Sequence, residues 1–583
     1  MNHMPEPMIG IDLGTTNSVL AVWRGGQPEV LADAGGRRLT PSVVGIDDDG
    51  SVLVGHAAKE RLLTHPGQTI AAFKRRMGTQ AEIDLGSGQR FRPEELSALV
   101  LKQLVRDAQA HLVAAAGERP GLPIRSCVIS VPAYFNDTQR KATRIAGELA
   151  GLDVTLINEP TGAAIAYGIH DRRDQQKLAV VDLGGGTLDV SILEFFDGVM
   201  EVHATAGDNF LGGEDFDQCL MTLFAAHHDL RIDGLSLREQ AVLKQQAVRA
   251  KHRLSGAQTA TMQLVHHARL REHQLQLELS RTELEAACKP LLDRLRATLE
   301  RALKDARLDL RTLDDVVLVG GATRMPMVRN LVGRLFGRLP LSHLDPDEVV
   351  GMGAAVQAGL RANDQALSDF VLTDVCPYSL GIEIAVERER KQHEAGHFLP
   401  IIERNTVVPV SRVERVVPVD PKQKVVQCRI FQGESRLVRN NIELGAIDIQ
   451  LPREGAADGV DVRFTYDADG ILEVSTQVVA SKETKSLVIV NSGRTLDEGE
   501  IAQRLARLDG LKVHPREQQE NRACVVRAER LFEECLGDER AVVAAALRDF
   551  EAVLDRQDPA AAQAARERLN ALLDRFDRDI FGP

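Results

Sequence analysis

Two glycine-rich segments of similar design restrict the fold of this chain more than any other feature. The first, IGIDLGTTNSVLAV, covers residues 9–22, and the second, VVDLGGGTLDVSIL, covers residues 180–193. In each, a hydrophobic run ends in Asp-Leu-Gly, small residues and threonine follow, and a second hydrophobic run resumes. Glycine weakens a strand unless another group must approach the backbone closely. Because the design occurs twice, we expect two similar halves that face each other across a cleft.

Such turns are suited to an anion. Backbone N–H groups without neighbouring Cβ atoms can converge on a phosphate, and threonine hydroxyls add further donors. Two facing turns would therefore hold a polyphosphate from both sides. Aspartates beside the turns would repel phosphate unless a divalent cation lay between them, and magnesium prefers to be bound through water. The candidate metal carboxylates are Asp12, Asp182 and Asp189.

Other known phosphate-binding patterns fit less well. A Rossmann turn needs Gly-x-Gly-x-x-Gly before a helix, but Asp189 stands where the last glycine belongs and a strand-like run follows. A Walker loop needs Gly-Lys-Ser or Gly-Lys-Thr, and the chain contains neither. A glycine bulge in a plain hairpin remains an alternative for a single copy, whereas the matched pair favours a ligand site. Two more glycine pairs, Gly212-Gly213 and Gly320-Gly321, would let a flat base approach the backbone.

Composition excludes some classes of protein. The 583 residues suggest several domains, and a net charge of −13 argues against nucleic-acid binding through a basic surface. The seven cysteines are scattered, odd in number and without a Cys-x-x-Cys pair, which indicates free thiols in a reducing cytoplasm rather than a zinc site. No apolar run is long enough to cross a bilayer, and residues 1–7 do not resemble a signal peptide. We therefore expect a cytoplasmic protein without a nucleic-acid or membrane partner.

The hydrophobic periodicity divides the chain into four parts. Up to residue 368, strand-like and helical runs alternate, which is typical of an α/β domain. Residues 369–375 form a short apolar segment that we interpret as an interdomain linker. From 376 to 495 the period becomes two, with a hairpin pattern at 460–474, so an antiparallel β-domain is expected. Residues 496–583 are predicted to be helical. Within the α/β domain, the expected strands are 8–13, 126–131, 178–182 and 316–319, and the expected helices are 93–116, 137–150, 237–254 and 281–306.

Five motifs, taken together, resemble the DnaK-type heat-shock chaperones of the heat-shock protein 70 family. Actin and sugar kinases share only the looser phosphate turns. The motifs lie in order along nearly the whole chain, at residues 10–18, 131–137, 157–161, 182–187 and 211–216. Three compact segments also resemble the HscC branch, at residues 207–210, 376–381 and 400–406. The resemblance implies a multidomain fold: an α/β actin-like ATPase domain of two lobes, then an antiparallel β-sandwich that binds peptide, then a short helical lid.

The resemblance implies ATP and Mg²⁺ as ligands, with K⁺ as a further candidate ion, and it assigns roles to single residues. Lys74 would steady the γ-phosphate and the attacking water, and Glu159 would orient that chemistry, which depends on positioning and electrostatics. Asp182 and Asp189 would order waters on the metal. The residues implied to contact phosphates are Asp12, Gly14, Thr15, Thr16, Gly184, Gly185, Gly186 and Thr187. Those implied at the nucleoside are Gly213, Glu214, Lys251, Ser255, Gly320, Gly321, Arg324 and Asp347.

A second set of residues is implied in peptide binding and in coupling between domains. Pro132 and Arg140 would act in the coupling between the domains, and Asp374 would act in the linker. The linker would dock on the ATPase domain when ATP closes the lobes. Alternation alone favours a plain core role for the candidate peptide residues. Those candidates are Ile382, Val416, Val419, Val426 and Cys428 in the pocket, with Ala385 at an arch over the peptide. Unfolded polypeptide clients and a J-domain cochaperone are the expected partners, and the need for a nucleotide exchange factor stays open.

The chain departs from the family pattern at several positions. Val248 replaces an acid that grasps the ribose hydroxyls, and Ala322 replaces a common serine. Thr373 replaces an aliphatic residue in the linker, and Thr155 replaces an arginine near the J-domain contact. The helical end is too short for a full lid, which implies a partial lid and faster peptide exchange.

Two other classes of protein were weighed against the chaperone. A small-molecule kinase of the same superfamily, or a filament-forming actin relative, would need neither the β-domain nor the apolar linker. Residues 369–495 therefore argue against both. An ATPase rate measured with and without an unfolded peptide separates the three, because only the chaperone should respond to the peptide.

Overall fold

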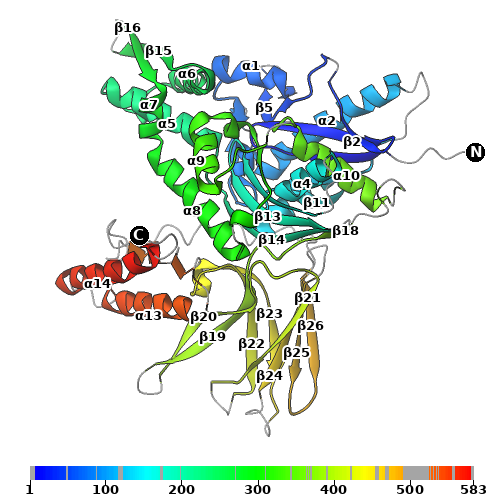
Figure 1. Ribbon diagram of the computed structural model, residues 1–583, viewed down its shortest axis with the longest axis vertical. Coiled ribbons are helices and arrows are strands. Elements are labelled where there is room, and N and C mark those ends of the chain that lie inside the picture. Colours follow the sequence, from blue (N-terminus) through cyan, green and yellow to red (C-terminus); the bar gives the residue numbers. More distant parts are fainter. Residues whose placement is uncertain are drawn as a thin grey trace, which may run out of the picture. The chain divides into compact units, whose positions relative to one another are not determined.

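The computed structural model divides the chain into two compact units, one ending at Val375 and the other beginning at Cys376 (Figure 1). The described residues are 7–33, 35–47, 50–86, 88, 90–115, 123–170, 175–196, 199–268, 271–308, 310–341, 344–362, 364, 367, 371–388, 392–419, 423–452, 459–466, 472–489, 524–525, 527–528, 531–532, 535, 537–554 and 559–578.

The first sheet of the first unit holds the first glycine segment in a hairpin. Its strand β1 (Met8–Asp12) pairs antiparallel with β2 (Asn17–Arg24) and parallel with β10 (Ser126–Val131). The residues between β1 and β2 are the first glycine turn. The sheet is completed by β3 (Gln27–Val30), β4 (Thr40–Pro41) and β11 (Asp153–Asn158).

The second sheet repeats this arrangement. Strand β12 (Gln175–Leu183) pairs antiparallel with β13 (Leu188–Phe196) and parallel with β17 (Asp315–Val319). The second glycine turn joins β12 to β13, as the first joins β1 to β2. The sequence repeat thus corresponds to a repeated sheet. The sheet is completed by β14 (Val199–Asp208) and β18 (Val371–Thr373).

Two helices, α4 (Glu159–His170) and α10 (Val349–Arg361), share one core with both sheets. That core contains apolar side chains from α4, α10, β10, β12 and β17. The two helices touch through their backbones, because a Cβ atom on Gly353 would lie 1.8 Å from the carbonyl oxygen of Gly162. A side chain at position 353 would separate the helices, so Gly353 sets the spacing between α4 and α10.

The remaining helices cover the outer faces of the sheets. Helices α2 (Pro93–Ala115) and α3 (Asp137–Leu149) pack in the core of the first sheet. The core of the second sheet includes residues of α5 (Gly213–His227), α6 (Leu237–Gly256), α8 (Lys289–Ala306) and α9 (Pro326–Phe336). Smaller elements of this unit are α1 (His56–Thr64), β5 (Val43–Ile46), β6 (Val52–Val54), β7 (Thr69–Ala71), β8 (Ile83–Asp84), β9 (Arg90–Phe91), β15 (Thr259–Ala268), β16 (Arg271–Ser280), η1 (Phe73–Arg76), η2 (Ile232–Gly234), η3 (Leu310–Thr312) and η4 (Gly321–Arg324).

One expected helix is two helices. The run from Arg281 to Ala306 breaks at Cys288 into α7 (Arg281–Ala287) and α8. Pro290 lies in the first turn of α8, where its missing N–H costs nothing, whereas inside a continuous helix its ring would clash with the preceding turn. The prediction of one helix over 281–306 was therefore wrong at this point.

The second unit contains two antiparallel sheets around one apolar core. The first has the strand order β20 (Gln392–Ile402), β19 (Leu380–Arg388), β22 (Val425–Gln432) and β23 (Ile442–Gln450), and η6 (Val438–Asn440) lies between β22 and β23. The second has the order β21 (Val410–Val416), β24 (Val460–Tyr466), β25 (Leu472–Val478) and β26 (Thr484–Ile489). Both sheets contribute to the core, as expected for a sandwich. The tip of the predicted hairpin, 467–471, lies outside the described residues.

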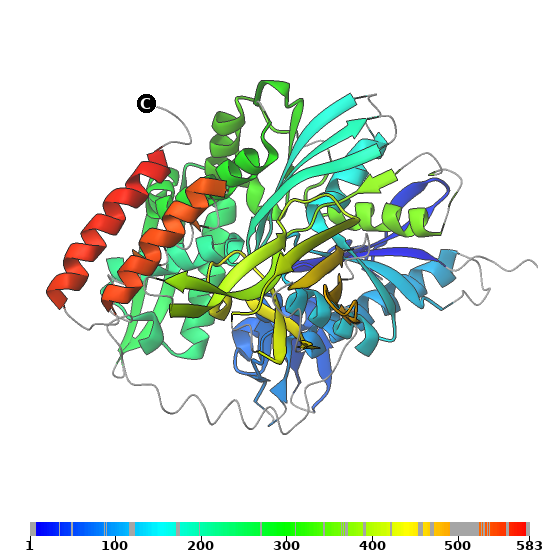
Figure 2. The same ribbon diagram turned by 90° about the horizontal axis from the view of Figure 1, so that it is seen from below.

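The helical end of this unit packs on the sandwich. Helices α13 (Gly537–Leu554) and α14 (Pro559–Arg578) lie side by side, as Figures 1 and 2 show. A guanidinium nitrogen of Arg540 is 3.4 Å from the Glu434 carboxylate, and Glu551 is paired with both Arg436 and Arg439. Residues 490–495 of the predicted β-domain and 496–523 of the predicted lid lie outside the described part of the chain.

Candidate functional site

The two glycine turns lie directly against each other. A Cβ atom on Gly185 would be 2.0 Å from Oγ1 of Thr16, and one on Gly186 would be 2.8 Å from Oγ1 of Thr15. No other residue type permits these approaches without moving the opposite turn. The two halves expected from the sequence therefore present their turns to the same space.

The other two glycine pairs adjoin the second turn. The N–H of Gly213, at the start of α5, donates to the carbonyl of Gly184 at 2.9 Å. A Cβ atom on Gly320, at the end of β17, would lie 2.4 Å from the carbonyl oxygen of Leu183. Four glycine segments from distant parts of the chain thus form one region of closely packed backbone, which is the geometry that an anion-binding site needs. We call this region the glycine cradle; it consists of the two glycine turns with Gly212-Gly213 and Gly320-Gly321.

Three aspartates lie beside these turns in an environment that disfavours their charge. Asp182 and Asp189 are buried, and Asp12 accepts a hydrogen bond of 2.7 Å from the Ser130 hydroxyl. Burial, with the nearby Glu159 carboxylate, raises the pKa of Asp12 to about 6 and that of Asp189 to about 8. The same two causes raise the pKa of Asp182 well above its usual range. Four carboxyl groups in one buried place need a compensating positive charge to stay ionised together.

The donor set fits a cation held through water. Oδ1 of Asp189 accepts from the Tyr134 N–H at 3.0 Å, whereas its buried Oδ2 has no hydrogen-bond partner in the described structure. Such an atom is costly unless function supplies a ligand. Among the described residues, no three His, Cys, Asp or Glu side chains are grouped to ligate a metal directly. Asp12, Asp182 and Asp189 are the residues that could hold a divalent ion, and magnesium usually keeps several of its waters when it binds carboxylates.

One lysine supplies part of the positive charge. Nζ of Lys74, on η1, lies 2.7 Å from Oε1 of Glu159, the first residue of α4, and both side chains are buried. Burial alone would lower the pKa of Lys74, but the carboxylates of Glu159 and Asp12 outweigh it and raise the pKa. Lys74 thus stays a fixed cation beside the glycine cradle.

A second buried ion pair lies at the start of α5. Nζ of Lys251, on α6, is 2.8 Å from Oδ1 of Asp217 and donates to the carbonyl of Gly213 at 2.9 Å. Glu214 is paired with Lys244, two turns before Lys251 on α6. Asp217 and Lys244 were not among the residues predicted from the sequence. Asp217 stands one residue after the 211–216 motif, which was the only signal for it.

The other predicted nucleoside residues lie on neighbouring elements. Arg324, in η4, is paired with Asp345 at 2.9 Å and with Asp347 at 2.8 Å. A Cβ atom on Gly213 would lie 3.6 Å from that of Ala322, so α5 and η4 are adjacent. The Ser255 hydroxyl donates to the Lys251 carbonyl within α6 at 3.1 Å. The structure therefore brings the predicted phosphate and nucleoside residues into one continuous region.

Comparison with known proteins decides the family. A family model described as Hsp70 protein matches residues 8–86 and 80–579. The chain is 39% identical to chaperone protein DnaK 1 of Synechococcus, over 97% of this chain and 79% of that protein. It is 40% identical to chaperone protein DnaK of Thermotoga neapolitana, over 85% of this chain and 83% of that protein. The chain belongs to the Hsp70 family. It is accordingly an ATP-dependent chaperone and an ATPase of protein folding, and this family binds nucleotide with a divalent metal.

In this Hsp70, the segment predicted to be the linker contributes a strand to the first unit. Val371–Thr373 forms β18, which pairs in parallel with Val199–Glu201 of β14. The next residue, Asp374, accepts a hydrogen bond of 2.9 Å from the Asn158 amide. Burial raises the pKa of Asp374. Thr373, despite its departure from the family pattern, therefore lies in a strand that is docked on the second sheet.

Hydrogen bonds connect this docked segment to Asn158, which is adjacent in sequence to the Lys74–Glu159 ion pair. Asn158 receives a 2.6 Å hydrogen bond from the Arg140 guanidinium, which also donates to the carbonyl of Ala133, next to Pro132. Asn158 directly precedes Glu159, the partner of Lys74. The sequence reasoning included Asn158 in a motif but gave it no role.

The predicted peptide residues differ in burial and position. Ile382 and Cys428 belong to the sandwich core, and Val416 and Val426 pack against it half-buried. Val419 is 48% exposed. Ala385 lies where the β19–β20 register shifts, so the strand bends there. For Ile382 and Cys428, burial alone is a sufficient structural reason for an apolar residue.

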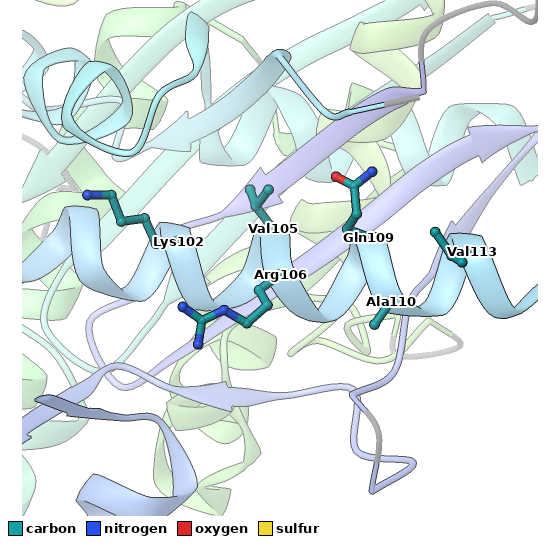
Figure 3. Close-up of a pocket in the computed structure, with 6 residues that line it drawn as sticks. All are labelled: Lys102, Val105, Arg106, Gln109, Ala110 and Val113. Carbon is teal, nitrogen blue, oxygen red and sulfur yellow. The ribbon is translucent and has the colours of Figure 1, made fainter. Parts of the chain in front are cut away.

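A shallow hollow follows one face of α2 and is separate from these groups (Figure 3). It is lined by Lys102, Val105, Arg106, Gln109, Ala110 and Val113. None of these residues belongs to the glycine cradle or to the predicted peptide pocket. Among the residues that the structure describes, no helix has the length and apolar character needed to span a membrane.

Proposed function

We propose that the facing glycine turns bind the triphosphate of ATP together with Mg²⁺. The observation that carries the proposal is the contact of Gly185 and Gly186 with Thr16 and Thr15 across the two sheets. A triphosphate between these turns would receive donors from both. The residues proposed to contact it are Asp12, Gly14, Thr15, Thr16, Gly184, Gly185, Gly186 and Thr187.

The buried charges are proposed to position the hydrolysis step. Mg²⁺ would screen the phosphate charge, and Asp12, Asp182 and Asp189 would hold it through water. Lys74 would steady the γ-phosphate, and Glu159 would keep the lysine in place, which their 2.7 Å contact supports. K⁺ is a second candidate ion for the same carboxylates. The nucleoside would lie between α5, α6 and η4, against Gly213, Glu214, Lys251, Ser255, Gly320, Gly321, Arg324 and Asp347.

We propose the following division of labour. Residues 1–368 are the ATPase domain, 369–375 the linker, 376–495 the peptide-binding sandwich and 496–583 a short lid. Peptide would enter against Ile382, Val416, Val419, Val426 and Cys428, with Ala385 at the arch. Pro132, Arg140 and Asp374 would couple the domains, which the hydrogen bond between Asn158 and Asp374 supports.

The finer placement of the protein is also a proposal. Compact motifs at 207–210, 376–381 and 400–406 favour the HscC branch. The expected partners are unfolded polypeptides and a J-domain cochaperone, and the expected location is the cytoplasm.

The test is the rate of ATP hydrolysis with and without an unfolded peptide. Thr187→Ala should bind nucleotide but hydrolyse it much more slowly, because it lacks the hydroxyl at the second turn. Thr205→Ala is the matched control, since Thr205 is equally buried but bonds to Ser191 within the sheet. Normal hydrolysis by Thr187→Ala, or a rate that ignores peptide, would contradict the proposal. A Thr187→Ala protein would also retain clients for identification in a pull-down.

A further inference from the structure

An arginine at the edge of the glycine cradle joins the two halves of the first unit. Arg75 follows Lys74 on η1, and its Nη2 lies 3.1 Å from Oδ1 of Asp215 in the first turn of α5. Each of the two side chains is 21% exposed, so the ion pair lies at the rim of the cradle rather than in a core. Neither residue was predicted from the sequence to act in the site.

The two ends of this ion pair are anchored in different cores. Phe73, two residues before Arg75, is buried in the core of the first sheet. Phe216, the residue after Asp215, is buried in the core of the second sheet. Each charged residue is therefore tied to its own half by a buried aromatic neighbour, and the distance between the charges depends on how far apart the halves are.

The ion pair also contacts the second glycine turn. A Cβ atom on Gly186 would lie 2.9 Å from Cγ of Arg75, so the stem of the arginine lies against this turn. Oδ2 of Asp215 accepts a hydrogen bond of 2.8 Å from the N–H of Gly212. Gly212 is packed on the same turn, since a Cβ atom there would be 2.4 Å from the nitrogen of Gly186. Because the pair spans both halves beside the turn, the halves cannot move apart here without breaking it.

A ring contact adds to the same link. The guanidinium carbon of Arg75 lies over the ring of Phe210, 6.0 Å from its centroid, in the segment between β14 and α5. A cation over the face of an aromatic ring is attracted by the negative charge of that face. Arg75 thus holds the second half through both a carboxylate and a ring face.

We propose that Arg75 is a positioning residue that holds the two halves together around bound nucleotide and thereby slows nucleotide release. This proposal rests on the proposed function, which places the triphosphate between turns of both halves. Such a ligand leaves faster when the halves separate more easily. Loss of the Arg75 contacts would leave Lys74 in its buried pair with Glu159, so release should change while the hydrolysis step does not.

The test is the rate at which a fluorescent ADP leaves the full-length protein in the presence of Mg²⁺, measured by stopped flow with excess unlabelled ADP. Arg75→Met removes the charge but keeps an apolar stem, and Asp215→Asn removes the charge but keeps an oxygen for the Gly212 N–H. Release should be about three- to tenfold faster in Arg75→Met and about two- to fivefold faster in Asp215→Asn, because partly exposed ion pairs and cation–π contacts are each weak. Single-turnover hydrolysis should stay within about twofold of the original rate in both variants.

A double variant and a control separate this link from general effects of charge. Since Arg75→Met already breaks the ion pair, the addition of Asp215→Asn should speed release no further. Lys177→Met is the control, because Lys177 and Glu194 form a partly exposed ion pair at 3.6 Å in which both residues lie on the second sheet. Nucleotide should leave this variant at the original rate.

Four results would overturn the proposal: release at the original rate from Arg75→Met and Asp215→Asn, a double variant whose effect is the product of the two single effects, hydrolysis that falls severalfold in Arg75→Met, and equally fast release from Lys177→Met. If Arg75→Met does not fold, which thermal unfolding will show, release from Asp215→Asn decides alone. If the unaltered protein binds no nucleotide, the proposed nucleotide site fails and this proposal with it, whereas original release rates in the variants refute only the role of Arg75.

Discussion

The ion pair between Lys74 and Glu159 offers the sharpest separation of catalysis from stability. Their atoms are 2.7 Å apart, and the two side chains are only 4% and 9% exposed. Removing one partner of a buried pair leaves an uncompensated charge, which costs about 3–5 kcal/mol. Here the remaining Glu159 carboxylate would also repel the carboxylates of Asp12 and Asp182, whose pKa values it already raises.

We therefore predict that a single and a double variant of this pair differ in stability but share the loss of ATPase activity. Lys74→Met should lower the melting temperature and reduce the ATPase rate by on the order of 10²–10³-fold. The double variant Lys74→Met/Glu159→Gln should recover much of the stability, because the charge of Glu159 is removed together with that of its partner, but none of the ATPase rate. The assays are thermal unfolding and single-turnover hydrolysis with saturating ATP.

A buried pair in the second unit serves as the control. Arg404 and Glu434 are 3.0 Å apart and each is 3% exposed. Arg404→Met should lower stability of the second unit but leave basal hydrolysis unchanged. If the Lys74 double variant regained hydrolysis together with stability, Lys74 would be a structural residue and the catalytic assignment would be refuted.

Four further predictions concern protons, coupling and the helical end. Since the pKa of Asp189 is raised to about 8, part of this carboxyl is protonated at pH 7, and binding of nucleotide with Mg²⁺ should release protons. Calorimetry in buffers of different ionisation enthalpy should detect this proton release. Binding without proton release would contradict a cation at these aspartates. The raised pKa also means that the folded protein holds a proton on Asp189 between about pH 4 and 8, where the unfolded chain has lost it. The contribution of Asp189 to the stability of the nucleotide-free protein should therefore fall as the pH rises through this range. Asp374→Ala should keep basal ATPase activity but lose most of the stimulation by peptide. Full stimulation of this variant by peptide would show that Asp374 is not needed for coupling. Arg436→Gln should speed peptide release severalfold in stopped-flow experiments, whereas Arg439→Gln should change the release rate little. Both arginines pair with Glu551, but the side chain of Arg436 is 4% exposed and that of Arg439 is 53% exposed. Equal effects of the two variants would argue against a role of the buried pair.

Much of the glycine cradle could be predicted because its signal is local. The glycines and threonines of the two turns are needed for a backbone shape that few other sequences allow, and the repeat at 9–22 and 180–193 marked both. The strand expectations at 126–131 and 316–319 agree with β10 and β17 to within one residue, since continuous apolar runs identify buried strands well.

Contacts between distant elements could not be predicted in this way. Asp217 and Lys244 became visible only when α5 and α6 were placed side by side, because nothing in a single segment reports its neighbour. The break at Cys288 was missed for a related reason. Helical periodicity continues across it, and only Pro290 marked the interruption.

The sequence by itself determined which backbone segments can approach a phosphate, because that ability depends on the absence of side chains at fixed positions. Tertiary structure alone decided which polar and charged side chains become partners. The pairs Asn158 with Asp374 and Asp217 with Lys251 are separated by long stretches of chain, and their distances depend on how whole sheets and helices pack. Packing is a collective property of many side chains, so no local pattern could encode these pairs.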